Sequence, residues 1–279
     1  MMLVTGANGQ LGSELRNLLG ASAVYIDRET LDISDEAAVR NYLKNNCFDC
    51  IINCAAYTAV DRAEDEPVQA NAVNHLGSLW LAKYGKRIIH ISTDYVFDGT
   101  SHVPYHEEDK TNPLSIYGKT KLAGEKAVLD YAETAVVLRT AWVYSPYGNN
   151  FVKNILRMGR TRESLRVVSD QIGSPTSAGD LAKSIIEILQ QMKTGKKDVY
   201  HFTNEGVCSW YDLAVAVMDL AGLSTPVIPI ESRDFPTKAV RPFYSVLSKR
   251  KIKTHYGLGI RHWREALGEV IKKINDKNH

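Results

Sequence analysis

The sequence has little of three things: long hydrophobic runs, cysteine and net charge. No apolar stretch in its 279 residues reaches the roughly 18 residues that a membrane helix needs. The segment Met1–Gly6 has neither a basic stretch nor a cleavage site, so we expect a cytoplasmic protein. A net charge of +2 argues against nucleic acid or anionic membrane as the main partner. The 44% of hydrophobic residues excludes global disorder.

The four cysteines do not form a complete metal site. Cys47 and Cys50 have the two-residue gap of many zinc ligands, but no nearby thiol or histidine completes the set. Cys50 and Cys54 lie in an apolar stretch typical of a buried strand, where cysteine behaves as a small hydrophobe. We therefore predict core packing for these thiols, and no metal.

Short apolar runs alternate with helical patterns over the first 140 residues or so, which favours an α/β fold with a doubly wound parallel sheet. The strands are expected at Met2–Thr5, Ala23–Asp27, Cys50–Asn53, Arg87–Ser92 and Ala135–Arg139. The helices between them are expected at Leu11–Leu19, Asp35–Lys44, Pro67–Lys83 and Pro113–Tyr131.

Later in the chain the rhythm loosens and prolines separate the elements, which favours a second, smaller α/β unit. We expect a first domain over residues 1–144 and 171–201, and a second domain over 145–170 and 202–279. Further elements are expected at Ala178–Gln191, Asp198–Phe202, Tyr211–Leu220 and Arg261–Ile274.

A glycine-rich segment follows the first expected strand and opens the first expected helix. Its glycines are Gly6, Gly9 and Gly12. Glycine is needed where the backbone approaches a pyrophosphate and where helix packs on strand, and the helix N-terminus offers free N–H groups to phosphate. The position of the motif therefore indicates a dinucleotide cofactor.

The second expected strand ends at Asp27 and Arg28. A carboxylate there would accept hydrogen bonds from the adenosine ribose, as in NAD sites. The neighbouring arginine would instead pair with a 2′-phosphate, as in NADP sites. The two residues favour different cofactors, and we keep NADH and NADPH as alternatives.

Tyr117 and Lys121 are four residues apart near the start of an expected helix and therefore share a face. A nearby ammonium, together with an oxidised nicotinamide, is expected to lower the phenol pKa, so that the tyrosine can act as an acid or base. Ser92 and Thr93 end an expected parallel strand, where ligands bind, and one of these hydroxyls could polarise a substrate carbonyl.

These residues together resemble the extended short-chain dehydrogenases/reductases. Longer segments are similar to reductases of that superfamily that act on dTDP-linked 4-keto sugars, and the similarity runs from residue 2 to about residue 270. The segments are Asn53–Glu64, Ser92–Gly99, Leu138–Tyr144, Asp170–Thr176 and Arg241-Pro242.

The resemblance implies that the first domain is a Rossmann-type NAD(P)-binding domain and that the second binds the sugar nucleotide. It also implies a role for each matching residue. It implies a catalytic triad of Thr93, Tyr117 and Lys121. It implies cofactor contacts, beside those of the glycines, from Gln10, Leu11, Asp32, Ile33, Ala56, Tyr57 and Thr58. It implies substrate contacts from Thr93, Asp94, Tyr95, Trp142 and Arg241, the arginine facing the nucleotide diphosphate.

By the same resemblance the chain would reduce the C4 ketone of a dTDP-linked 4-dehydro-6-deoxy-L-hexose with NADPH or NADH. A homodimer and a magnesium ion at Glu14 are further implications, against the alternative of an ordinary helical glutamate. The alternatives for the whole chain are a nucleotide-sugar epimerase or dehydratase, and a non-catalytic subunit similar to the β subunit of methionine adenosyltransferase. Asn71 and Asn74 share a face of the helix expected over Pro67–Lys83. The resemblance implies that such an asparagine organises an active-site water, and the alternative is a bridge to backbone groups.

Overall fold

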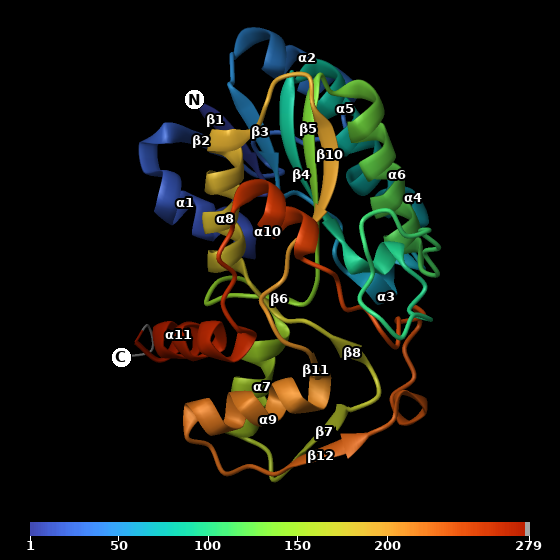
Figure 1. The fold of residues 1–279 in the computed structure, drawn as a ribbon, viewed down its shortest axis with the longest axis vertical. Helices are drawn as coiled ribbons and strands as arrows, with labels where there is room; N and C mark the ends of the chain where they lie inside the picture. Colours follow the sequence, from blue (N-terminus) through green and yellow to red (C-terminus); the bar gives the residue numbers. More distant parts are fainter. Residues whose placement is uncertain (277–279) are drawn as a thin grey trace.

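The structure, a computed structural model, describes residues 1–276. Six parallel strands form one sheet in the upper half of the molecule (Figure 1), which confirms the expected α/β class. The strands lie in the order β10 (Lys197–His201), β5 (Thr134–Thr140), β4 (Arg87–Thr93), β3 (Cys50–Asn53), β1 (Met2–Thr5) and β2 (Ala23–Ile26).

The strand order reverses at the first strand. The chain passes from β1 to β2 on one side and then returns to place β3 on the other side of β1. In open parallel sheets the ligand crevice lies beyond the carboxyl ends of the strands at this reversal. The topology therefore places a binding site between the turns that follow β1 and β3.

Helices cover both faces of the sheet. Leu15 and Ile185 belong to the hydrophobic cluster on one face, and Val39 and Val128 to the cluster on the other. The first face carries α1 (Gln10–Leu19), α8 (Ala178–Gln191) and α10 (Arg250–Tyr256). The second face carries α2 (Glu36–Asn45), α5 (Ser78–Tyr84) and α6 (Ile116–Tyr131).

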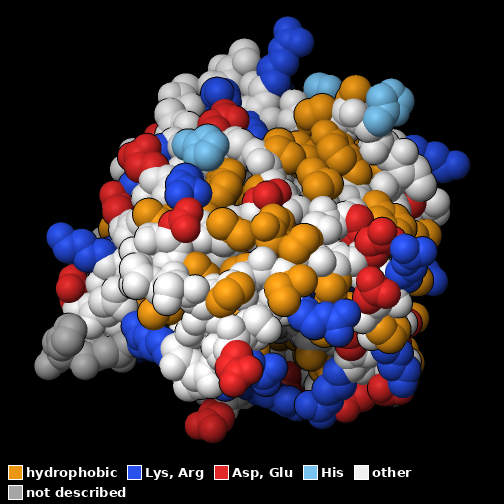
Figure 2. All heavy atoms as spheres, turned by 90° about the horizontal axis from the view of Figure 1, so that it is seen from below, with side chains coloured by type: hydrophobic (Ala, Val, Ile, Leu, Met, Phe, Trp, Pro, Cys, Tyr) orange, Lys and Arg blue, Asp and Glu red, His pale blue; other side chains and the backbone are white. Residues whose placement is uncertain are grey.

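A third hydrophobic cluster fills the lower half (Figure 1) and is built from residue 142 onward. Its helices are α7 (Phe151–Gly159), α9 (Trp210–Ala221) and α11 (Trp263–Asp276). Its short strands are β6 (Val143–Tyr144), β7 (Leu165–Val168), β8 (Ile172–Gly173), β9 (Thr176–Ser177), β11 (Cys208–Ser209) and β12 (Val227–Ile230). Seen from below (Figure 2), hydrophobic side chains gather in the middle of this end with charged side chains around them.

The central strands agree with the expected ranges to within a residue at each end, whereas the helix expected over Pro67–Lys83 is interrupted. Helix α4 (Pro67–Asn71) continues into a π-helical turn, η2 (Ala72–Gly77), before α5 begins. Helices α7 and α10 and the short α3 (Val60–Ala63) were not expected. Helix α10 lies in the range expected for the second unit, yet its Ile252 packs in the sheet core. The domain boundaries themselves stay a prediction.

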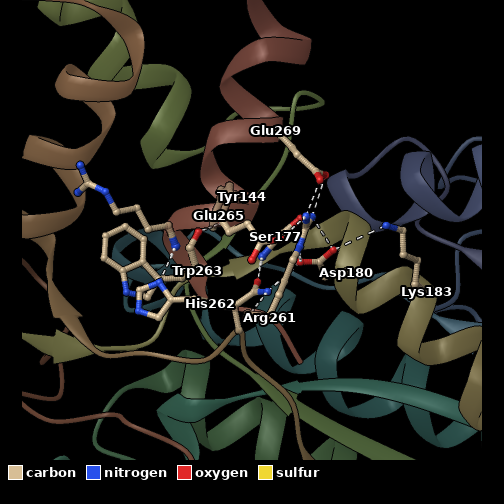
Figure 3. A network of polar contacts seen from close by, with 11 residues as sticks. Tyr144, Ser177, Asp180, Lys183, Arg261, His262, Trp263, Glu265 and Glu269 are labelled. Carbon is tan, nitrogen blue, oxygen red and sulfur yellow. Dashed lines mark hydrogen bonds and ion pairs between the residues drawn. The ribbon is translucent and has the colours of Figure 1, made fainter. Parts of the chain in front are cut away.

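An arginine joins the two halves (Figure 3). Arg261, just before α11, donates to both carboxylate oxygens of Asp180 on α8, at 2.7 and 2.9 Å, and to Glu269 on α11. Asn204 donates to the same Asp180 at 2.8 Å and accepts from the backbone N–H of Ser177. Two-point carboxylate contacts of this kind hold their partners in one orientation.

In residues 1–276, no helix is both long and apolar enough to span a bilayer.

Candidate active site

The glycine loop between β1 and α1 is built for close backbone approach. Gly6 has a left-handed φ of +65°, and a Cβ there would lie 2.7 Å from the backbone nitrogen of Ala55. A Cβ at Gly12 would lie 2.5 Å from the carbonyl oxygen of Gly6. Gly9 is the N-cap of α1 and offers no capping side chain, so the first N–H groups of this helix are available to an anion.

A large cleft of about 1250 Å³ opens at this loop and runs across the carboxyl ends of the central strands. Nearly every residue expected to bind cofactor or substrate lines it; Gly12 does not, because it lies behind Gly6. The lining set is Gly6, Gly9, Gln10, Leu11, Asp27, Arg28, Asp32, Ile33, Ala56, Tyr57, Thr58, Thr93, Asp94, Tyr95, Tyr117, Lys121, Trp142 and Arg241.

At the end of β2 the Asp27 carboxylate is already hydrogen-bonded. It accepts from Asn8 at 2.7 Å and from the backbone and hydroxyl of Thr30, contacts that lower its pKa. Arg28 is 73% exposed and makes one contact, to Asp32 at 3.3 Å. An exposed guanidinium with free N–H groups can meet a phosphate, while the oriented carboxylate can still accept from a hydroxyl.

Tyr117, Thr93 and Lys121 meet at the carboxyl end of β4. Lys121 is almost fully buried, and its ammonium donates to the carbonyl of Ile91 at 2.6 Å. Thr93 donates to Asp94 and accepts from the N–H of Tyr95, and its hydroxyl lies near enough to the Tyr117 phenol to affect the phenol's pKa. A hydroxyl, a phenol and an ammonium therefore converge on one wall of the cleft.

Burial raises the pKa of Tyr117 to about 12, and the nearby Thr93 hydroxyl only partly offsets this. The lowering expected from an ammonium together with an oxidised nicotinamide stays a prediction. Burial also lowers the pKa of Lys121 to about 8, opposed by the charge of Glu125, and raises that of Asp94 to about 6. Burial disfavours the charged form of each group, so near neutral pH the phenol keeps its proton.

Ser92, the other hydroxyl expected at the reacting centre, has a different role. Because side chains alternate along a strand, Ser92 points away from Thr93. It donates a short hydrogen bond to Glu125 on α6, which also forms a buried ion pair with Arg139 on β5 at 2.8 Å. Arg139 continues the network to the carbonyl of Glu107 at 3.3 Å. The network lies directly beneath the helix that carries Tyr117 and Lys121.

Asn74 bridges backbone and side-chain groups, as in the second of the two alternatives given above. Its side chain accepts from the N–H of Tyr57 at 2.8 Å and donates to the carbonyl of the same residue at 3.2 Å. It also donates to the hydroxyl of Thr120 at 3.1 Å. The π-helical turn that carries Asn74 thus joins the loop after β3 to the catalytic helix.

Trp142 leaves the end of β5 in the left-handed region, with φ at +49°, a strain of about 1–3 kcal/mol for a residue other than glycine. It lines the cleft and is only half-buried. Its indole stacks on that of Trp210, with ring centroids 3.6 Å apart and 11° between the planes. The residue is therefore both a cleft wall and a packed side chain.

Arg241 reaches the cleft from the segment that follows β12, and Asp61 on α3 holds it. The guanidinium donates to the Asp61 carboxylate at 2.8 Å, and the same carboxylate accepts from the N–H of Ala239 at 3.1 Å. The Nε of Arg241 is buried without a partner. The segment is thus tied to α3 while Arg241 keeps donors for an anionic ligand.

A metal site finds no support among the described residues. Over residues 1–276 no three His, Cys, Asp or Glu side chains come together as metal ligands would. Glu14, expected beside magnesium, is buried in α1. Cys50 is buried in β3 as expected, and burial raises its thiol pKa to about 12, which leaves it unreactive.

Sequence reasoning missed several cleft residues. Trp210, Arg62 and Glu66 line the cleft, as does the loop at Gly148 and Asn149. Arg62 lies in the segment Asn53–Glu64 that carries the resemblance. The helix expected from Tyr211 onward indicated core packing next to Trp210 rather than a cleft.

The fold, the glycine loop and the Tyr117/Lys121 helix define a Rossmann-type oxidoreductase of the short-chain dehydrogenase/reductase class. The chain matches the family described as RmlD substrate binding domain over residues 1–276. A dTDP-4-dehydrorhamnose reductase from Aggregatibacter actinomycetemcomitans is 41% identical, over 96% of this chain and 97% of that protein.

Solved structures agree. One dTDP-4-dehydrorhamnose reductase from Clostridium acetobutylicum has a TM-score of 0.94 at 40% identity, with 98% of this chain and 99% of that one covered. Another, from Bacillus anthracis in complex with NADP, has a TM-score of 0.93 at 35% identity, with 98% of both chains covered. This chain belongs to the dTDP-4-dehydrorhamnose reductase family.

The buried pair of Arg139 and Glu125 predicts that substitutions of the two residues have non-additive effects on stability. Arg139→Met leaves the Glu125 carboxylate buried without its cation, so we expect the free energy of unfolding to fall by about 3–5 kcal/mol. Adding Glu125→Leu should recover much of that loss. Denaturant unfolding measures the free energy of unfolding of both variants. The control is Lys83→Ala, which breaks an exposed ion pair and should lower the free energy of unfolding by less than about 1 kcal/mol. A double variant as unstable as the single one would contradict the assignment.

The end of β2 predicts dual cofactor use. NADH and NADPH should both support turnover, with efficiencies within about tenfold, or about 1.4 kcal/mol. Arg28→Ala should weaken NADPH and leave NADH unchanged, because only NADPH carries the 2′-phosphate. Titration of both cofactors at fixed substrate is the measurement. A preference above about a hundredfold in the unmodified protein would show that one of the two residues does not reach the ribose.

Proposed function

We propose that this chain reduces the C4 ketone of dTDP-4-dehydro-β-L-rhamnose (dTDP-4-dehydro-6-deoxy-L-mannose) to dTDP-L-rhamnose with NADPH or NADH. The observation that carries the proposal is the convergence of Tyr117, Thr93 and Lys121 in the same cleft as the glycine loop. Relatives of about 40% identity over the whole chain bear the name of this activity, and one related structure holds NADP.

The residues present fit a nicotinamide dinucleotide. A Cβ at Gly6 or Gly12 would fill the place where backbone lies, so the loop can form only with glycine. The N–H groups at the start of α1 and the exposed Arg28 are suited to donate to its phosphates, and the Ala56–Thr58 loop would contact its nicotinamide side. When bound, the cofactor supplies the hydride.

Each reacting side chain has a defined task. The Thr93 hydroxyl polarises the ketone, and Tyr117 transfers its phenolic proton to the oxygen as negative charge develops there. The high pKa of Tyr117 keeps that proton available, and the Lys121 ammonium stabilises the phenolate that remains. One ketone, one hydride and one proton give one alcohol, so the reaction balances.

The sugar nucleotide has a matching set of contacts. Asp94, Tyr95 and Trp142 face the cleft beside Tyr117 and are suited to the sugar, and Arg241 is suited to its diphosphate. The third hydrophobic cluster, in the lower half of the molecule, packs around Trp142 and would form the sugar-nucleotide side of the cleft.

The test is to supply the purified chain with NADPH and the dTDP-linked 4-keto sugar. We expect loss of nicotinamide absorbance in a one-to-one ratio with dTDP-L-rhamnose, identified by NMR. Product without net cofactor consumption would indicate an epimerase or dehydratase. Cofactor binding with no turnover would favour a non-catalytic subunit.

Tyr117→Phe separates proton transfer from binding. We expect kcat to fall at least about a hundredfold, because a positioned acid contributes about 10²–10⁴-fold. NADPH affinity should hardly change, since the ring still packs edge-on against Tyr95 at 5.6 Å. Tyr95→Phe is the matched control, which should alter KM more than kcat. Near-normal turnover by Tyr117→Phe would remove Tyr117 as the acid.

Lys121 predicts the alkaline limb of the pH profile. Its pKa of about 8 lies below that of Tyr117, so as pH rises the lysine loses its charge first, while the phenol stays protonated. We therefore expect kcat/KM for the sugar to be highest below about pH 8 and to fall above it. Stopped-flow or steady-state rates from pH 6 to pH 10 or so measure the limb. A flat profile across that range would contradict a role for the ammonium.

A further inference from the structure

Two tryptophans from distant parts of the chain form a stacked pair in the cleft wall. Trp142 follows β5, whereas Trp210 is the first residue of α9. The rings are nearly parallel, with centroids 3.6 Å apart, and both side chains line the cleft. Phe151 packs on Trp210 with a centroid distance of 4.6 Å. Trp210, from a distant part of the sequence, therefore contacts Trp142 within the cleft wall.

The backbone of Trp142 needs such a contact. Trp142 is the one non-glycine residue in the described part of the chain with positive φ, a conformation that L residues leave when nothing holds them. On another side the indole lies against Gly173, where a Cβ would come within 2.7 Å of its Cε2. The ring position is thus set by the Trp210 indole and by the absence of a side chain at Gly173.

Trp210 is itself rigidly placed. Ser209 and Asp212 form a reciprocal cap at the start of α9, with Asp212 N–H donating to the Ser209 hydroxyl at 3.0 Å and Ser209 N–H to the Asp212 carboxylate at 2.9 Å. The preceding strand β11 pairs with β8, so Cys208 lies opposite Gly173. One short sheet therefore carries both supports of the Trp142 ring.

We propose that Trp210 is a positioning residue for sugar-nucleotide binding, which holds Trp142 in its left-handed conformation with the indole in the cleft wall. The inference rests on the proposed function for its kinetic consequence, but the stacking can be tested without it. Without the Trp210 ring, Trp142 relaxes to an ordinary backbone conformation and its indole leaves the position that faces the substrate.

The first experiment reads the position of the ring directly. The chain has four tryptophans, so fluorotryptophan labelling should give four fluorine NMR signals, each assigned by single substitution. We expect Trp210→Leu to shift the Trp142 signal strongly, and Trp210→Phe, which keeps a stacking ring, to shift it less. Tyr211→Leu removes the neighbouring aromatic of the same cluster and should leave the signal in place. An unchanged Trp142 signal in Trp210→Leu overturns the proposal.

The second experiment measures the consequence. Trp210→Leu should raise KM for the dTDP-linked 4-keto sugar about tenfold or more while Kd for NADPH stays unchanged, and Trp210→Phe should restore most of the loss. Gly173→Ala pushes the ring from the other side and should raise KM although Trp210 is intact.

The outcomes separate the two claims. An equal loss in Trp210→Leu and Tyr211→Leu, with a matching fall in Tm, would show a merely structural role and overturn the inference. If the unmodified chain does not reduce the sugar, the proposed function fails, and the fluorine signals still decide whether Trp210 positions Trp142.

Discussion

The buried ion pair between Arg139 and Glu125 is the contact on which the arrangement of the reacting groups depends. It joins β5 to α6, and Ser92 on β4 donates to the same carboxylate. Neither charge can lose its partner at low cost away from water, so the pair fixes how α6 is rotated against the sheet. Tyr117 and Lys121, about two turns and one turn earlier on that helix, are thereby directed to the carboxyl end of β4.

A short acidic segment after β3 links the walls of the cleft in the same way. Asp61 holds Arg241, Glu64 accepts from the first N–H of α6 at 2.8 Å, and Glu66 accepts from the Tyr57 hydroxyl at 2.7 Å. Three neighbouring carboxylates therefore tie Arg241, the start of α6 and the Tyr57 loop to one segment. Movement of any one wall would disturb the other two, which favours a cleft formed before substrate arrives.

The sequence was sufficient to predict cleft residues where the pattern depends on neighbouring residues in the chain. The glycine spacing, the four-residue step from Tyr117 to Lys121 and the strand ends at Asp27 and Thr93 are set by short-range geometry. Apart from Gly12, these residues all line the cleft. Strand alternation could also have shown that Ser92 and Thr93 face opposite ways. The stack of Trp142 on Trp210 could not be foreseen, because it joins residues far apart in sequence and a left-handed tryptophan has no sequence signature.

Burial raises the pKa of Tyr117 and lowers that of Lys121, so it favours the neutral form of both groups. It favours the neutral phenol of Tyr117, the form that a reductase needs, but also the neutral amine of Lys121, which cannot stabilise a phenolate. The Glu125 carboxylate, one turn from Lys121, opposes the second effect and keeps the ammonium charged near neutral pH. The carboxylate that orients α6 therefore also supports the positive charge of Lys121. The orientation of α6 and the charge on Lys121 thus depend on one buried group.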